Sequence, residues 1–369
     1  MRLRRVLPHL LCGAAMAAVL PGCGGGGSPS MSESTPSGAS AEAPARASAD
    51  RLTLRQQVGQ TVILAFAGTS APDYVLRALR ERRAAGVILF AGNVVDTGQL
   101  RALTGSLQAA AGGRALVMLD QEGGDVRIAK FAEPVAGQSS LADPAAAAAA
   151  ARAAAHDLGR VGVNVNLAPV ADVGRGGALA SRSYPGDAKA VAAATAAAVG
   201  AYEDGGVLPA AKHFPGLGGA GENTDDAAVD VDLKGDDLIP FRAAIRAGVP
   251  LIMVSHAVYP SLDRDHPASR SATILRDLLR GRLGFRGVVI TDSMEARASL
   301  SGTTLTAAAA GSLAAGADLL LLTGDGSFRP VSLALAARAR SDDTFRARVR
   351  DAAARVLALR AGLSPPGSR

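Results

Sequence analysis

From about residue 52 onward, the chain alternates eight short apolar runs with longer stretches of helical character. The runs are nearly continuous in apolar residues, as expected for parallel strands that are buried on both faces. We predict strands at residues 61–66, 87–90, 115–120, 163–169, 208–213, 251–256, 287–292 and 318–323. This alternation is typical of a repeated β/α unit.

The stretches between these runs predict helices, among them residues 144–161, 188–204, 238–247, 271–282 and, as a closing helix, 331–359. The two alanine-rich stretches have high helix propensity. Eight β/α units predict an α/β fold, a single TIM-type (β/α)8 barrel. A doubly wound open sheet is the rival fold. It is disfavoured because notable polar residues follow at least five different strands instead of gathering at one crevice.

The first 22 residues are predicted to be a lipoprotein signal peptide. Three arginines among the first five residues precede a short apolar region, and Leu20-Pro21-Gly22-Cys23 has the form of a lipoprotein cleavage box. The apolar region is shorter than the roughly 20 residues of a spanning helix. We expect lipidation at Cys23 and an extracytoplasmic, membrane-anchored protein of the cell envelope. An ordinary signal peptide is the alternative.

Residues 23–50 are rich in Gly, Ser, Pro and Ala, which predicts a lipidated flexible linker without stable structure. Cys12 lies in the predicted signal and Cys23 is the predicted lipid attachment site. These are the only two cysteines of the chain. The mature protein is therefore not expected to contain a disulfide or a cysteine metal site.

The charge balance gives little indication of a nucleic-acid partner. The chain has 39 Lys and Arg against 33 Asp and Glu, and three of the basic residues lie in the predicted signal. The remaining excess is small and dispersed, without a basic cluster interleaved with aromatic residues. We expect a monomer that binds no nucleic acid.

Charged residues stand at the ends of three predicted strands. Asp120 opens Asp120-Gln121-Glu122-Gly123-Gly124, Lys212 and His213 open Lys212-His213-Phe214-Pro215-Gly216, and Asp292 ends the most apolar run. In a barrel, the carboxyl ends of the strands converge on one mouth, where catalysis takes place. A lone carboxylate such as Asp292 is either a catalytic group or a structural partner for a loop amide, and its position alone leaves both open.

Together these motifs resemble glycoside hydrolase family 3, most closely its single-domain bacterial β-N-acetylhexosaminidase lipoproteins. The resemblance implies that residues 51–365 form a barrel of the family's N-terminal type. It also implies that Asp292, in Thr291-Asp292-Ser293-Met294-Glu295, is the nucleophile of a retaining glycosidase. We expect no metal or organic cofactor, because no ligand-spaced His/Cys set and no phosphate-binding glycine motif occurs in a suitable context.

The same resemblance implies several sugar-binding residues. Asp120, Lys212 and His213 match residues that bind sugar hydroxyls, and the Lys-His and Phe-Pro peptide bonds of that motif are often cis in relatives. Arg182, in Ser181-Arg182-Ser183-Tyr184-Pro185-Gly186-Asp187, matches an arginine that reaches the substrate. His256 matches another family stretch, in contact with the substrate or behind it. Arg127 stands one residue before the position of a family arginine, which is Ile128 here.

One catalytic part of the family pattern is missing. Cell-wall hexosaminidases of the family continue from Lys-His-Phe-Pro-Gly to an Asp-Ser-His segment, whose histidine is the general acid/base. Here Asn223-Thr224-Asp225 occupies that position and the loop contains no histidine. A carboxylic acid can serve instead, as in most glycosidases. Asp225 is the positional candidate, followed by Asp226 and Glu222, and a solvated acidic loop is the alternative.

The sequence therefore predicts a retaining hydrolase that removes a terminal β-linked sugar, most simply N-acetylglucosamine from a cell-wall glycan or muropeptide. A loop carboxylate would replace the usual histidine, with a pKa raised by burial or by Asp292. A catalytically impaired glycan-binding lipoprotein and a β-glucosidase of the same family are the alternatives.

Overall fold

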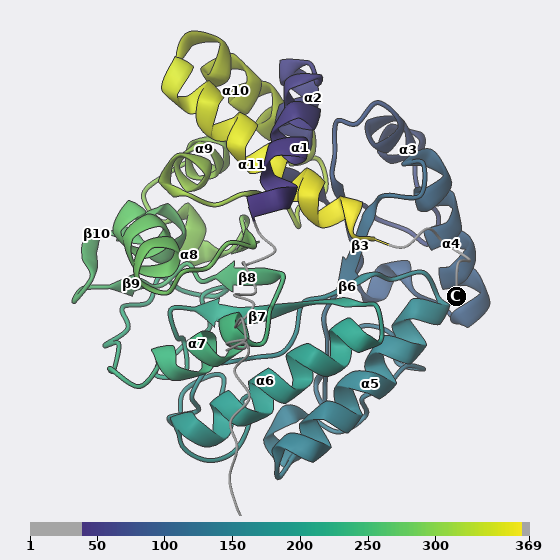
Figure 1. Cartoon of the computed structure of the whole chain (residues 1–369). Helices are drawn as coiled ribbons and strands as arrows, with labels where there is room; N and C mark the ends of the chain where they lie inside the picture. The colour runs from purple at the N-terminus through teal and green to yellow at the C-terminus, as the bar shows by residue number, and fades with distance from the viewer. Residues whose placement is uncertain (1–38, 364–369) are drawn as a thin grey trace, which may run out of the picture. The chain divides into compact units, whose positions relative to one another are not determined.

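The computed structural model of the chain describes residues 39–363. Within them, eight parallel strands close into a barrel in the order β1-β12-β11-β8-β7-β6-β3-β2, with helices packed around it (Figure 1). The barrel strands are β1 (Val62–Leu64), β2 (Gly86–Ile88), β3 (Leu116–Leu119), β6 (Val165–Asn166), β7 (Leu208–Phe214), β8 (Leu251–Val254), β11 (Val288–Ser293) and β12 (Leu319–Leu321). The predicted TIM-type barrel is confirmed, and each predicted strand overlaps an observed one.

The helices follow the strands as a β/α barrel requires. They are α1 (Ala39–Asp50), α2 (Leu54–Gly59), α3 (Asp73–Arg80), α4 (Thr97–Ala110), α5 (Pro144–Arg160), α6 (Ala188–Asp204), α7 (Leu238–Arg246), the π-helix η4 (Thr273–Arg282), α8 (Arg297–Leu300), α9 (Leu305–Ala315), α10 (Phe328–Ser341) and α11 (Asp343–Ala361). Short 3-10 turns are η1 (Ala91–Asn93), η2 (Gln138–Ser140) and η3 (Ala268–Arg270). Two hairpins leave the barrel: β4 (Gln121–Gly123) with β5 (Val126–Arg127), and β9 (Val258–Tyr259) with β10 (Asp263–Pro267).

The two alanine-rich helices begin at the signals that the sequence contains. The Asp143 side chain accepts a hydrogen bond from the Ala146 amide, with Pro144 at the first helical position. Asp187 caps α6 through the amides of Lys189 and Ala190. Helices α5 and α6 lie side by side (Figure 1), where small alanine side chains allow close approach.

The prediction of one closing helix over residues 331–359 is wrong in one respect. The segment contains two helices, α10 and α11, which meet at Asp342. Asp342 has an extended backbone, and its side chain accepts a hydrogen bond from the Phe345 amide. A capping aspartate thus starts a second helix where the sequence pattern suggested continuation.

The prediction that residues 24–50 have no stable structure is also wrong for their last part. Residues 39–50 form α1, which packs on α11 through Ala45, Ala49, Ala353 and Ala354. The Gln57 side-chain amide donates to the Ala49 carbonyl at 2.9 Å. Tertiary packing therefore makes a helix of a segment whose composition resembles a linker. The rest of the predicted linker, the signal peptide and Cys23 lie outside the described residues.

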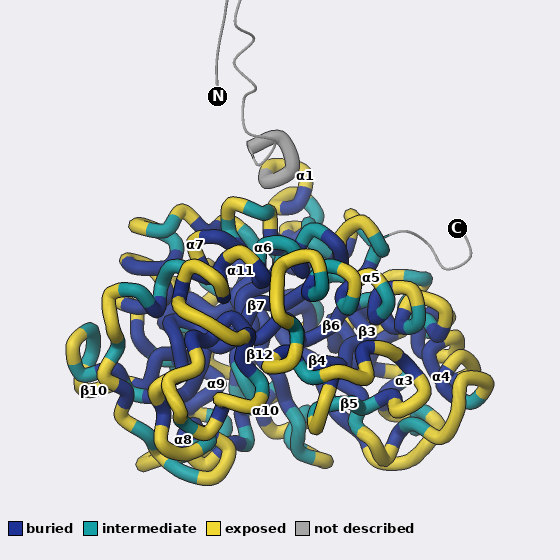
Figure 2. Tube along the Cα trace, turned by 90° about the horizontal axis from the view of Figure 1, so that it is seen from below, coloured by how far each residue is buried: buried dark blue, intermediate teal, exposed yellow. Residues whose placement is uncertain are grey.

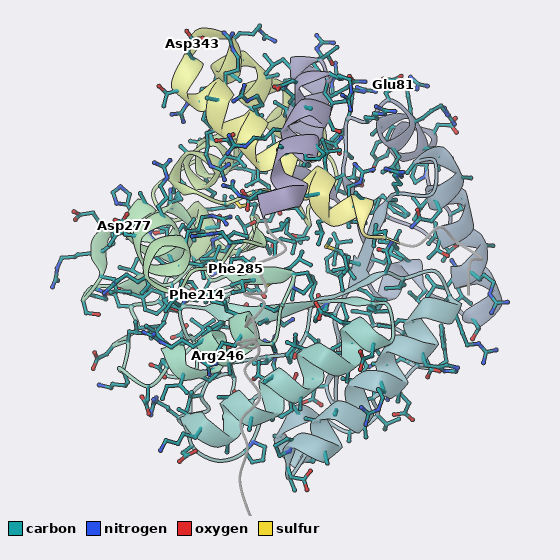
Figure 3. The ribbon with its side chains drawn as sticks, in the orientation of Figure 1. Glu81, Phe214, Arg246, Asp277, Phe285 and Asp343 are labelled. Atoms are coloured by element: carbon teal, nitrogen blue, oxygen red, sulfur yellow. The ribbon has the colours of Figure 1, made fainter. Side chains whose placement is uncertain are left out.

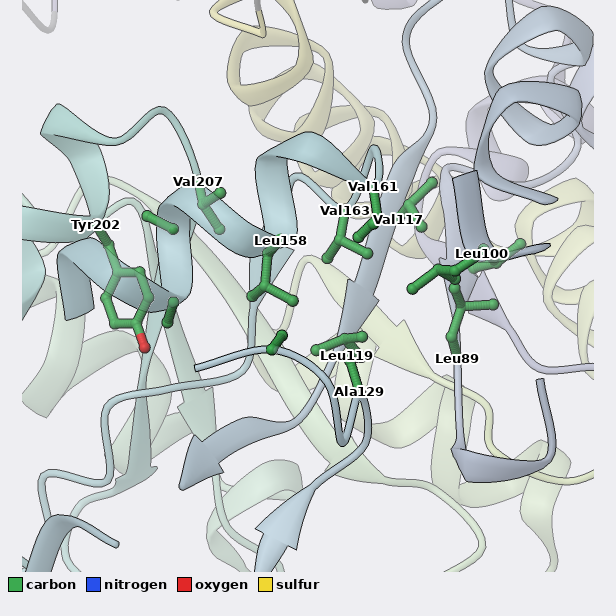
Figure 4. Packing of buried hydrophobic residues seen from close by; sticks show 14 of the residues in the cluster. Leu89, Leu100, Val117, Leu119, Ala129, Leu158, Val161, Val163, Tyr202 and Val207 are labelled. Atoms are coloured by element: carbon green, nitrogen blue, oxygen red, sulfur yellow. The ribbon is translucent and has the colours of Figure 1, made fainter. Parts of the chain in front are cut away.

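Two apolar layers hold the barrel together. Inside, the barrel core includes Ile63, Met118 and Ile290, and it is joined by Val356 from α11. Outside, β3 packs its other face against α4 and α5 (Figure 4), with contributions from Leu119, Leu100, Leu158, Val117, Val161 and Val163. Burial on both faces explains why the strand sequences are apolar without alternation.

The buried strands and the exposed outer segments separate clearly (Figure 2). Charged side chains such as Glu81, Asp277 and Asp343 are exposed on outer helices, whereas Phe214 and Phe285 are buried (Figure 3). Among residues 39–363, no helix has both the length and the apolar character to cross a membrane. Within the same residues, no cluster of His, Cys, Asp and Glu has the arrangement of a metal site.

Candidate active site

Four charged side chains form an ion cluster at the carboxyl end of the barrel. Lys212, at the end of β7, places its Nζ 2.5 Å from Asp120 Oδ1 and 2.5 Å from Glu122 Oε1. Arg182 donates two hydrogen bonds to Glu122, from Nε at 2.8 Å and from Nη2 at 2.7 Å. Three of the predicted site residues, Asp120, Arg182 and Lys212, are thereby brought together, with Glu122 as the common partner of Arg182 and Lys212.

The cluster is charged at neutral pH. Burial alone would raise the pKa of Glu122, but Lys212 and Arg182 outweigh it and lower that pKa from 4.5 to about 2. Burial opposes the charge of Lys212, yet Asp120 and Glu122 raise its pKa. Burial likewise opposes the charge of Arg182, and Glu122 raises its pKa. The site therefore keeps fixed cations and anions that can hydrogen-bond to hydroxyl groups.

His213 is held by a carboxylate that the sequence reasoning missed. Asp172, fully buried, accepts hydrogen bonds from His213 Nδ1 at 2.7 Å, from the His213 amide and from the Leu217 amide at 2.6 Å. The Lys212–His213 and Phe214–Pro215 peptide bonds are cis, as the resemblance implies. Asp172 follows the predicted fourth strand in Pro169-Val170-Ala171-Asp172, and this position after a strand was the available signal.

Asp292 stands near the end of β11, where the Ser293 amide donates to its Oδ1 at 2.8 Å. Burial would raise the pKa of Asp292, but His213 and His256, together with that amide and Lys212, lower it. Asp292 is therefore ionised at neutral pH. Its charge is coupled to side chains at the ends of β7 and β8, which indicates one shared site at the barrel mouth.

His256 lies beneath this site. It is buried, and its Nδ1 pairs with Ser269 Oγ at 2.7 Å. Burial lowers the pKa of His256, although Asp292 and the backbone of Asp292 and Ser293 partly oppose this shift. Within the described residues, His256 Nε2 has no hydrogen-bond partner despite the proximity of that backbone. The protonation of His256 is thus linked to the charge of Asp292.

Asp225 lies on the loop of residues 221–227, and the residue is exposed to solvent. Partial burial of its carboxyl and the charge of Asp292 raise its pKa, while His213 and Arg182 oppose the shift. Its charge is therefore coupled to three of the predicted site residues. Glu222 and Asp226, the other loop candidates, are also exposed.

Arg127 has a different environment. It lies in β5, and its Nη2 donates to the carbonyls of Lys130 and Ala132 at 2.8 and 3.0 Å. Within residues 39–363 it has no hydrogen bond or ion pair with the cluster. The structure therefore uses Arg127 to brace the segment after β5, and it does not join Arg127 to Asp120.

The comparisons with known proteins identify the family of the chain. Residues 53–359 match the Glycosyl hydrolase family 3 N terminal domain. The chain belongs to glycoside hydrolase family 3. A β-hexosaminidase of Stenotrophomonas maltophilia strain K279a is 35% identical over 279 residues, which cover 71% of this chain and 82% of that protein.

Two solved structures share the fold at useful sequence identity. The β-N-acetylhexosaminidase of Beutenbergia cavernae has a TM-score of 0.78 and 34% identity, covering 84% of this chain and 99% of that one. A family 3 β-N-acetylglucosaminidase from a Paenibacillus strain has a TM-score of 0.79 and 33% identity, covering 84% of this chain and 63% of that one. The family 3 protein described here is a glycosidase that acts on O-glycosyl bonds, as the resemblance implies.

Proposed function

We propose that this glycosidase is a retaining β-N-acetylhexosaminidase that removes terminal β-linked N-acetylglucosamine from cell-wall fragments. Asp292 is the nucleophile and Asp225 is the general acid/base. Support for the sugar comes from the relatives, since several are named β-hexosaminidase or β-N-acetylglucosaminidase. Support for the residues comes from one observation: the charges of Asp225 and Asp292 are coupled, and the pKa of the first is raised while that of the second is lowered.

These opposite shifts suit the two steps of a double displacement. In the first step, ionised Asp292 attacks the anomeric carbon and forms a glycosyl ester. The bond from that carbon to the leaving oxygen breaks, and protonated Asp225 donates its proton to that oxygen. In the second step, the Asp225 carboxylate takes a proton from water, the water oxygen attacks the anomeric carbon, and the ester bond to Asp292 breaks.

The ion cluster provides the contacts that hold the sugar. Asp120 is an acceptor for sugar hydroxyls, while Lys212 and Arg182 are donors. His213 Nδ1 is engaged by Asp172, so Nε2 is the ring nitrogen available to a hydroxyl. Hydrogen bonds to charged partners are strong, and they orient the anomeric carbon toward Asp292.

The sugar specificity is tested with a series of aryl β-glycosides, using the Asp292→Asn protein as the blank. We expect the highest kcat/KM with the N-acetylglucosaminide. A preference for the β-glucoside would instead make the protein a β-glucosidase. Covalent trapping by a 2-fluoro sugar, followed by mass spectrometry of the labelled peptide, should place the label on Asp292.

The role of Asp225 is tested with leaving groups of different basicity. Asp225→Ala should lose about 10²- to 10⁴-fold on glycosides with poor leaving groups, which need a proton donor. It should retain most of its activity on activated aryl glycosides, and azide should accelerate it. Asp226→Ala is the matched control and should behave as the wild type. Equal losses on both substrate classes without azide rescue would remove Asp225 from this role.

We also propose that the protein is anchored to the extracytoplasmic side of a membrane through a lipid on Cys23. The cleavage box Leu20-Pro21-Gly22-Cys23 supports this placement. Replacing Cys23 with Ser should release the protein from the membrane fraction. Recovery of that variant in the membrane would contradict lipidation.

A further inference from the structure

The loop that carries Asp225 is bonded to the segment that follows the nucleophile. The Arg297 amide donates to the Asp225 carbonyl at 3.2 Å, and the Ala298 amide donates to the Thr224 carbonyl at 3.1 Å. Arg297 and Ala298 are the first two residues of α8, which follows Asp292 after a short turn. The first amides of a helix have no partner within the helix, so the loop carbonyls satisfy donors that would otherwise need water.

The same loop is also held by the burial of one of its side chains. Thr224 is 1% exposed, and its hydroxyl has no hydrogen-bond partner within the described residues. The side chain therefore contributes by packing and not by polar contact. Asn223 completes the turn, because its Oδ1 accepts from the Asp225 amide at 3.2 Å.

The segment leading into the loop is also anchored. Leu217 is 1% exposed and belongs to an apolar cluster with Phe214 and Phe241. The amides of Arg175 and Ala178 donate to the carbonyls of Gly218 and Ala220 at 3.2 and 2.9 Å. The chain leading into Asp225 is thus held by contacts that involve no substrate.

We propose that this main-chain clamp, in which the Arg297 amide holds the Asp225 carbonyl, sets the acid/base against the nucleophile before substrate binds. Arg297 is a positioning residue through its backbone, and its exposed side chain has no part in this role. The proposal rests on the proposed function of Asp225. It deepens that function by stating how the acid/base is held in place before substrate binds.

The physical reason lies in the tolerance of proton transfer to misplacement. An acid must lie within hydrogen-bond reach of the leaving oxygen. A displacement of about 1 Å can cost roughly 10²-fold in rate. The two hydrogen bonds join the long loop between β7 and α7, which carries Asp225, to α8, which begins shortly after the end of β11. They therefore tie the loop of the acid to the segment that directly follows the strand of Asp292.

Arg297→Pro removes the donor with little other change. Proline has no amide hydrogen, and it is favoured at the first position of a helix. The preceding residue, Ala296, has φ −54° and ψ 141°, which suits a residue before proline. Arg297→Ala is the matched control, because it removes the same side chain and keeps the amide.

The readout is the ratio of kcat/KM values for a poor and an activated leaving group. We expect Arg297→Pro to lose about 10- to 100-fold relative to Arg297→Ala on the poor leaving group, and much less on the activated one. KM should change little, because the sugar-binding cluster lies on other elements. Equal ratios in the two variants would overturn the clamp, whatever Asp225→Ala shows.

Hydrogen exchange in the wild-type enzyme provides a second test that does not depend on the variant folding. The amides of Arg297 and Ala298 should be protected in the absence of substrate. Exchange at the rate of free amides would overturn the proposal. Failure of the proposed function gives a different result. In that case Asp225→Ala loses the same kcat/KM on poor and activated leaving groups.

Discussion

Glu122 joins the two cations of the ion cluster at the barrel mouth, and its replacement by Gln should affect both folding and catalysis. The carboxylate accepts two hydrogen bonds from Arg182 and lies 2.5 Å from Lys212 Nζ. It is 3% exposed, so water cannot replace these partners. Gln keeps the shape but removes the charge, and its amide group faces a cation.

The structure gives the magnitude of this effect. The pKa of Glu122 is lowered from 4.5 to about 2. At 1.36 kcal/mol per pKa unit, this shift corresponds to about 3 kcal/mol of stability. Removing one partner of a buried ion pair typically costs about 3–5 kcal/mol, which agrees. The raised pKa values of Lys212 and Arg182 express the same interactions and are not added.

Urea unfolding of the wild type and of Glu122→Gln measures the loss in the free energy of unfolding. Its pH dependence tests whether the charge of Glu122 is the cause. Because folding lowers the pKa of Glu122, its stabilising contribution is fully present at pH values above its pKa in the unfolded chain. The difference between wild type and Glu122→Gln should therefore be constant near neutral pH and shrink as pH falls from 4.5 toward 2.

Glu81→Gln is the matched surface control, since Glu81 pairs with Arg83 at 2.7 Å on an exposed helix end. Its loss should be about 0–1 kcal/mol. A loss for Glu122→Gln no larger than that of the control would refute the electrostatic reasoning. The kcat/KM of Glu122→Gln should also fall, because both cations of the proposed sugar-binding cluster lose their common partner.

Two further predictions concern packing. Gly218→Ala would place a Cβ 1.9 Å from the Val173 carbonyl oxygen. It should therefore displace the loop that carries Asp225 and lower both Tm and kcat/KM. The control Gly219→Ala has open space around its Cβ and should leave both nearly unchanged. Ala49→Asp introduces a charge at a fully buried position of α1. It should lower the free energy of unfolding by about 1–3 kcal/mol and make that helix sensitive to limited proteolysis. Ala47→Asp, at an exposed position of the same helix, should do neither.

The sequence allowed the barrel and the polar ends of its strands to be predicted for a simple reason. A strand covered on both faces is apolar throughout, so the point where it turns polar marks the mouth of the barrel. Asp120, Lys212, His213 and Asp292 all stand at such points. Their order along the chain was therefore enough to bring them into one site.

Glu122 and Asp172 were missed because their roles depend on partners that the chain order does not reveal. Glu122 follows β3, and its partners Lys212 and Arg182 come from distant segments. Asp172 lies beyond the end of a predicted strand and serves His213 on the neighbouring strand. Such roles arise from the closure of the barrel and not from any local pattern.

Helix α1 was missed for a different reason. Its sequence contains Pro44 and has the alanine- and serine-rich composition of a linker. Isolated helices of this length are marginal in water, so most of their stability comes from tertiary packing. In α1 that packing consists of small alanine side chains against α11. Such a contact leaves no hydrophobic periodicity in the sequence from which it could be predicted.

In the mechanism that we propose, Asp225 can take the place of the family's histidine because the environments of the two carboxyls differ. Burial and the charge of Asp292 favour the protonated form of Asp225, while His213 and His256 favour the ionised form of Asp292. Once Asp292 has formed the glycosyl ester, its charge is gone and the pKa of Asp225 should fall. In this proposal the proton donor of the first step becomes the base of the second, so one interaction between two carboxyls serves both halves of the reaction.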